Sequence, residues 1–171
     1  KDGTINIWDL RSGGEILHTL KHGRWLRGVA FAPDGTLFSA GDLTLASSCF
    51  KLWNPKTGGL SKTITNSMPE ILAACLSPDG KTIASCGARV SENGKTMWTD
   101  LTLWNAVTAK SGSTVTTNFF NLDRLSFCPD QDYLLGTTQS EAFLWHSRSG
   151  KLERTHNEGG RWFSAAAFSP D

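Results

Sequence analysis

The sequence predicts an all-β protein made of a repeated unit of short antiparallel strands, and two spacings carry this prediction. Tryptophan recurs at intervals of 45, 51 and 41 residues, at Trp8, Trp53, Trp104 and Trp145. A Pro-Asp pair follows each of them, and the Asp always lies 26 residues after the Trp, at Asp34, Asp79, Asp130 and Asp171. Because the variation falls only between each Asp and the next Trp (19, 25 and 15 residues), one part of the unit is structurally fixed and one loop tolerates insertion.

Four strand signals recur in each unit. Segments that end in Trp alternate with a period of two, which predicts strands at 4–8, 49–53, 100–104 and 141–145. Apolar segments run into the Pro-Asp turn at 29–35, 74–80, 125–130 and 166–171, because Pro presets φ and a following Gly accepts positive φ. Strands are predicted after that turn at 36–41, 81–87 and 133–138, and after the turn that follows each Trp at 14–20, 59–64, 113–117 and 151–156. No segment shows a helical period.

A unit of four strands in about 45 residues resembles the WD-repeat β-propeller family. The segment "DGTINIWD" (2–9) is close to the family's defining segment, and "VAFAPDG" and "LSPDGKTIASCG" match its first two strands. Only Trp8-Asp9 keeps the literal Trp-Asp pair, since the other three repeats have Trp-Asn, Trp-Asn and Trp-His. The resemblance covers essentially the whole chain.

The resemblance implies one β-propeller domain over 1–171, an incomplete arc of four-stranded antiparallel blades. Full blades are expected at roughly 25–65, 70–118 and 121–156, with partial blades at 1–20 and 161–171. Family members usually close a ring of about seven blades, which three full and two partial blades cannot do. We therefore expect a fragment of a chain about twice as long, with open edges that promote self-association.

A hydrogen-bond network inside each blade is also implied by the resemblance: a His before the first strand, a Ser or Thr in the second, an Asp in the next turn and the Trp in the third. No full blade has the complete set. His22, Ser39 and Trp53 can form a partial network, and the alternative for His22 is a solvated loop residue. The Trp position of the other repeats is held by Trp8, Trp104 and Trp145.

Loop aromatics are the candidate partner-binding residues. Trp25 and Trp162 occupy the same place in their repeats, and each follows an Arg, at Arg24 and Arg161. Arg and Trp are enriched at interface hot spots, although a Trp here can instead shield the core between blades. The longest insertion, 87–100, contains the tight-turn pair Asn93-Gly94 and predicts an extended hairpin. It carries Met97 and Trp98, which either mark a contact site or fold back on the rim.

Composition excludes several classes of function. The net charge is +1 and no run of Lys or Arg exceeds two, which argues against nucleic acid and membrane surfaces as partners. No apolar run approaches the roughly 20 residues of a membrane span. The four cysteines lack metal-ligand spacing and are expected to be buried free thiols, which favours a reducing, cytoplasmic location. No cofactor site or catalytic His arrangement is apparent, so we expect no enzyme.

The sequence therefore predicts a noncatalytic protein–protein interaction scaffold, part of a larger WD-repeat protein, that binds other proteins or peptides through its loop rim. One alternative is a regulatory or sensor segment attached to a kinase or another effector domain. Another is a propeller enzyme, which would need inward-facing acids or histidines at equivalent places in several blades.

Overall fold

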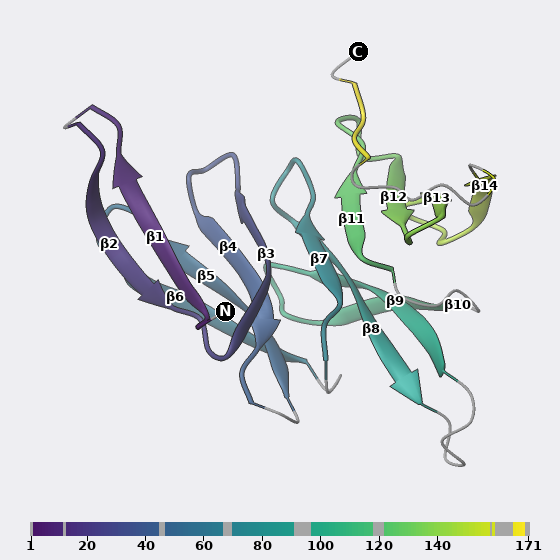
Figure 1. Ribbon diagram of the computed structural model, residues 1–171, viewed down its shortest axis with the longest axis horizontal. Coiled ribbons are helices and arrows are strands. Elements are labelled where there is room, and N and C mark those ends of the chain that lie inside the picture. Colours follow the sequence, from purple (N-terminus) through teal and green to yellow (C-terminus); the bar gives the residue numbers. More distant parts are fainter. Residues whose placement is uncertain are drawn as a thin grey trace. The chain divides into compact units, whose positions relative to one another are not determined.

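The computed structural model describes residues 2–11, 13–44, 47–66, 70–90, 97–117, 122–157, 159 and 166–169. Every regular element within these ranges is a β-strand in an antiparallel sheet, which confirms the predicted fold class. No helix able to cross a membrane occurs in these ranges. The chain forms two compact units, Lys1–Ile71 and Leu72–Asp171 (Figure 1). That residues 1–171 make one domain stays a prediction.

The first unit holds a two-stranded and a four-stranded sheet, each with its strands in chain order. The smaller sheet pairs β1 (Thr4–Asp9) with β2 (Glu15–Lys21). The larger sheet consists of β3 (Trp25–Phe31), β4 (Leu37–Asp42), β5 (Ser48–Asn54) and β6 (Gly59–Asn66). Every residue of strand β4 is buried, so this strand forms part of the core against which β3 and β5 pack. The core between the two sheets contains Ile5, Leu20, Leu37 and Trp53.

The second unit holds two four-stranded sheets. The first consists of β7 (Ala73–Leu76), β8 (Thr82–Val90), β9 (Met97–Asn105) and β10 (Ser111–Thr117). The second consists of β11 (Arg124–Phe127), β12 (Tyr133–Thr137), β13 (Glu141–His146) and β14 (Leu152–Asn157). Strands β7 and β11 lie next to each other, and one apolar core, which includes Cys86, Leu122 and Trp145, joins the two sheets.

The predicted hairpin extension is confirmed, because β8 and β9 are 9 residues long, against 6 and 7 for β4 and β5. Their pairing continues to Val90 and Met97. The predicted final strand at 161–171 lies mostly outside the described residues, and 166–169 form no strand.

The recurrent Asp residues cap the turns that the sequence predicts. Asp34, Asp79 and Asp130 each accept a hydrogen bond from the backbone N–H two residues on, at 2.8, 3.0 and 3.0 Å. This Asx-turn geometry fixes the hairpin between the first and second strands of each full sheet.

A second turn recurs five residues after each Trp, and every residue there has a positive φ. The φ values are 92°, 70°, 62° and 68° at Gly13, Gly58, Ala109 and Gly150. Glycine adopts this conformation without a steric penalty, whereas the Cβ of alanine does not fit it well. Ala109 is therefore strained in a turn for which the other repeats use glycine.

Replacing Ala109 with glycine is expected to raise the free energy of unfolding by about 0.5–1 kcal/mol, because relief of the strain exceeds the added freedom of the unfolded chain. Urea denaturation of the full chain measures this change. Gly13→Ala is the matched reverse variant, since a Cβ at Gly13 would meet no atom within 4 Å. It should lower stability by a similar amount, and an Ala109→Gly variant no more stable than the parent would contradict the strain argument.

Candidate functional site

A chain of buried polar groups crosses the β3–β6 sheet. The Nδ1 atom of His22 lies 2.7 Å from the Oγ atom of Ser39 on β4, and the indole Nε1–H of Trp53 on β5 donates to the same Oγ at 2.8 Å. All three side chains are buried. The arrangement connects the loop before β3 to the second and third strands of the sheet, as the family resemblance implies for these three residues.

His22 makes further contacts that tie the two sheets of the first unit together. Its backbone N–H donates to the Gly3 carbonyl at 2.8 Å, and the His22 carbonyl accepts a hydrogen bond from Lys51 Nζ at 2.5 Å. Its Nε2 atom lies 3.6 Å from the Cys49 Sγ atom. Burial, together with the nearby Lys51 charge, lowers the pKa of His22 to about 4. The imidazole is therefore neutral at pH 7.

The tryptophans at the equivalent positions of the other sheets have different surroundings. Trp104 Nε1–H donates to Ser85 Oγ at 2.9 Å. Trp145 packs against Gly136, where an added Cβ would lie 2.6 Å from the ring, so close packing replaces the serine of the other sheets. Trp8 is 54% exposed in the two-stranded sheet, in which β1 pairs with β2.

The end of the sheet at Trp25 is a rigid platform. Trp25 begins β3 and pairs with Asp42, the last residue of β4, while the Arg24 backbone N–H donates to the Asp42 carbonyl at 2.8 Å. A Cβ at Gly41 would lie 2.0 Å from the Trp25 carbonyl oxygen, so only glycine permits this close approach of the strands. The Trp25 side chain is 39% exposed on this fixed backbone.

Two guanidinium groups flank the exposed indole. The Cζ atoms of Arg24 and Arg27 lie 4.8 and 5.8 Å from the Trp25 ring centroid. Arg27 sits at a β-bulge, where the register shifts between Leu26 and Gly28, and bulges re-aim side chains in this way. Its Nη2 atom lies 2.5 Å from Glu70 Oε1. Arg24, Trp25, Arg27 and Glu70 are called the Trp25 cluster below.

Asp42 lies next to the cluster, because it pairs with Trp25 across β3 and β4. It is buried, and its carboxylate accepts the Ile71 backbone N–H at 3.4 Å. Burial raises the pKa of this carboxyl. Sequence reasoning identified Arg24 and Trp25 but missed Asp42, Arg27 and Glu70. No sequence signal marks the bulge or the contact between Arg27 and Glu70, which lie 43 residues apart.

The structure does not describe the side chains of the other predicted partner-binding residues. Met97 and Trp98 begin β9 and pair with Val90 and Arg89 on β8, but their side chains lie outside what the structure describes. Arg161 and Trp162 also lie outside the described residues. Their binding role stays a prediction.

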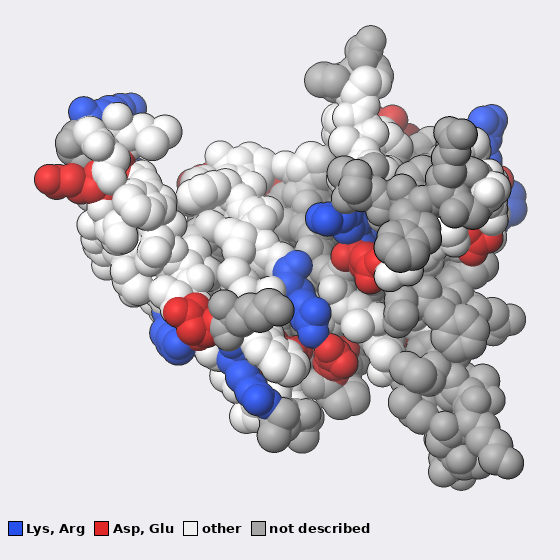
Figure 2. Space-filling model, viewed as in Figure 1, with Lys and Arg blue, Asp and Glu red and all other residues white. Residues whose placement is uncertain are grey.

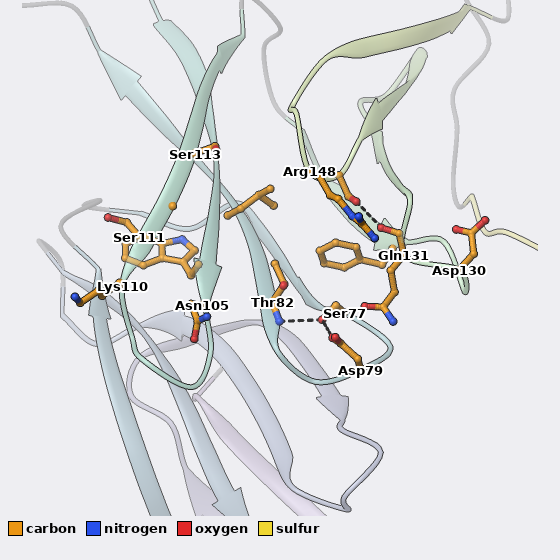
Figure 3. A pocket seen from close by; sticks show the side chains of 15 residues that line it. Ser77, Asp79, Thr82, Asn105, Lys110, Ser111, Ser113, Asp130, Gln131 and Arg148 are labelled. Atoms are coloured by element: carbon orange, nitrogen blue, oxygen red, sulfur yellow. Dashed lines mark hydrogen bonds between the residues drawn. The ribbon is translucent and has the colours of Figure 1, made fainter.

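A cavity of about 570 Å³ lies between the two sheets of the second unit (Figure 3). Leu103, Trp104 and Phe127 supply its apolar lining, and its polar lining includes Asp79, Asn105, Lys110, Gln131 and Arg148. Figure 3 places Asp79, Gln131 and Arg148 on one side and Lys110 on the other. The volume of the cavity suits a small ligand. Its lining carries acidic and basic side chains in equal number, so their charges favour neither an anion nor a cation.

Gln131 closes one side of this cavity. It has a φ of 68° in a turn position that Gly35 and Gly80 hold in the earlier repeats. When the Gln131 amide is oriented so that its oxygen and its nitrogen both have suitable hydrogen-bond partners, the nitrogen donates to the two Asp79 carboxylate oxygens at 3.1 and 3.2 Å. The strained turn thus supplies a hydrogen bond between neighbouring sheets, which a glycine could not make.

The possible metal ligands of the described part of the chain are scattered. No group of three or more His, Cys, Asp or Glu residues there could hold a metal ion. All four cysteines are free; Cys49 and Cys86 are buried, and Cys75 and Cys128 are half-buried. Burial raises the pKa of Cys86 to about 12, which keeps it as an unreactive thiol. Figure 2 shows blue and red atoms scattered singly or beside one another on the face in view, without a continuous basic field.

Comparison with known proteins supports the architecture. The family "WD domain, G-beta repeat" matches residues 14–54. Apoptotic protease-activating factor 1 of Homo sapiens is 32% identical over 140 residues, which cover 75% of this chain and 10% of that protein. WD repeat and SOCS box-containing protein 1 is 33% identical over 90 residues in Takifugu rubripes, covering 51% of this chain and 20% of that protein.

The chain thus spans about a tenth to a fifth of the length of these curated relatives. The family match falls on β2 to β5, which include Ser39 and Trp53 of the buried network. The repeat spacing, the four-stranded antiparallel sheets and these matches agree, and the chain belongs to the WD-repeat family.

Proposed function

We propose that this chain is a noncatalytic protein-interaction scaffold that binds proteins or peptides through the Trp25 cluster. WD repeats generally serve as interaction scaffolds and are generally noncatalytic. The observation that carries the proposal is the Trp25 indole, 39% exposed and flanked by two guanidinium groups. Exposed Trp and Arg side chains on a fixed backbone are typical interface hot spots.

A fixed backbone favours this site over the exposed apolar residues in turns, such as Leu10 and Val107. Close packing at Gly41 and the backbone hydrogen bond from Arg24 to Asp42 hold the platform before any partner arrives. Binding of a partner therefore costs little conformational entropy, because the site is already ordered. An entirely shielding role for Trp25 does not account for its exposed fraction, although the buried part of the ring also covers the sheet end.

The remaining features of the proposal concern its setting. The scattered charges argue against nucleic acid as a partner, and the four free thiols favour a cytoplasmic location. The binding roles of Met97, Trp98, Arg161 and Trp162, and self-association through open propeller edges, stay predictions. So does attachment to a kinase or other effector domain.

Affinity capture tests the proposed site. The tagged parent protein, expressed in its own source organism, is compared with its Trp25→Ala variant, which should recover its specific partners at least about tenfold less well, as loss of a hot spot predicts. Leu10→Ala is the control, because it removes an apolar side chain that is 86% exposed in the turn after β1. Undiminished recovery by a folded Trp25→Ala variant would refute the assignment.

A further inference from the structure

We infer that the Trp25 cluster recognises a peptide segment in which a carboxylate side chain lies next to an apolar one. This inference rests on the proposed function and adds the chemistry of the partner. It follows from which charges of the cluster are already neutralised and which are open.

Arg27 is already paired. Its guanidinium lies 2.5 Å from the Glu70 carboxylate, so both of these charges are used within the chain. Asp42, the other nearby acid, is buried and accepts a backbone hydrogen bond from Ile71. Asp42 is therefore closed to a basic partner group, and a basic group would have to displace Arg27 to reach the Glu70 carboxylate.

Arg24 is the open charge. Its side chain is exposed, and no carboxylate of the described residues lies within 4.0 Å of its guanidinium. Its contact is with the Trp25 ring, at 4.8 Å. A guanidinium that stacks on an indole keeps its N–H groups free at its edge, and that planar fork matches a carboxylate in a bidentate pair.

The apolar part of the partner follows from Trp25. An apolar side chain beside the carboxylate would cover the exposed part of the indole while the acid pairs with Arg24. Covering the ring also removes water from around the ion pair, which strengthens it relative to an ordinary surface salt bridge. A basic peptide would instead meet two guanidinium groups and an acid, Glu70, that Arg27 already holds.

Titration of the full chain with short capped peptides tests this chemistry. The probes are acetyl-Leu-Glu-Leu-amide, its Gln and Lys analogues, and its phosphoserine analogue, because a phosphate could use the same donors. Binding is followed by the NMR signals of the Trp25 indole N–H and the Arg24 side-chain N–H. We expect the Glu peptide to bind about tenfold more tightly than the Gln peptide, and the Lys peptide to shift neither signal.

Arg24→Gln should weaken binding of the Glu peptide about tenfold and remove its preference over the Gln peptide. Arg24→Lys should keep part of the preference, because charge remains but the planar fork is lost. Arg11→Gln, an exposed substitution in the turn after β1, is the control and should bind like the parent.

Equal affinity for the Glu and Gln peptides, or a preference that survives Arg24→Gln, would overturn the inference. Tighter binding of the phosphoserine peptide than of the Glu peptide would also overturn it, since the natural partner would then be a phosphopeptide. Partner capture that is lost in Trp25→Ala but unchanged in Arg24→Gln would overturn the carboxylate chemistry and leave the proposed binding site intact.

Discussion

Replacing Ser39 with alanine is expected to lower the free energy of unfolding of the full chain by about 2–4 kcal/mol, because two buried polar groups lose a partner at once. The Ser39 hydroxyl accepts from Trp53 Nε1–H at 2.8 Å and bonds to His22 Nδ1 at 2.7 Å. No water reaches this part of the sheet easily, since His22 and Ser39 are both fully buried. Each group left unsatisfied costs about 1–3 kcal/mol. Urea denaturation followed by far-ultraviolet circular dichroism measures the loss.

Ser85→Ala provides the matched comparison. Ser85 is equally buried on β8 and accepts the indole N–H of Trp104, but no described His bonds to its hydroxyl. Its replacement should cost about half as much, roughly 1–2 kcal/mol. Equal losses from the two substitutions would mean that the bond between His22 and Ser39 contributes nothing measurable. A loss below about 1 kcal/mol for Ser39→Ala would contradict the whole network argument.

The strands were predictable from the sequence because their limits depend on local chemistry. The segment predicted at 4–8 is observed as β1, Thr4–Asp9, and that predicted at 133–138 as β12, Tyr133–Thr137. Alternation with a period of two indicates which residues face the core, and the Asp side chains that cap the turn after the first strand of each full sheet limit that strand. Both signals act over a few residues, so one sequence suffices to find them.

The binding surface was only partly predictable, because its remaining groups come together through register. Arg24 and Trp25 stand out as an Arg-Trp pair, but the bulge that places Arg27 beside the indole follows from how β3 pairs with β4. The contact of His22 with Cys49 also depends on folding, since 27 residues separate them. Gln131 was partly predictable. Glycine holds the same place in the earlier repeats, so the sequence marks Gln131 as unusual, but no sequence signal indicates its hydrogen bond to Asp79.

Lowering the pH from 7.5 to 5 is expected to reduce the stability of the parent chain by about 2 kcal/mol more than that of a His22→Gln variant. The pKa of His22 is about 4 in the folded chain, below its ordinary value of 6.5, because burial penalises the imidazolium. The unfolded chain therefore binds the extra proton first. The stabilisation is complete above pH 6.5 and is lost as the pH falls toward 4.

Comparing the two proteins isolates this residue. Hydrogen bonds hold the pKa values of Asp34 and Asp130 below 3.8, so the stability they contribute is lost only at pH values below this window. Asp42, whose pKa is raised by burial, acts in the opposite direction but equally in both proteins. Denaturation curves at pH 7.5, 6.5, 5.5 and 5 give the difference directly. Parallel pH profiles would mean that His22 is protonated or solvated in the folded chain, and its role as a neutral link between Ser39 and the loop before β3 would then be wrong.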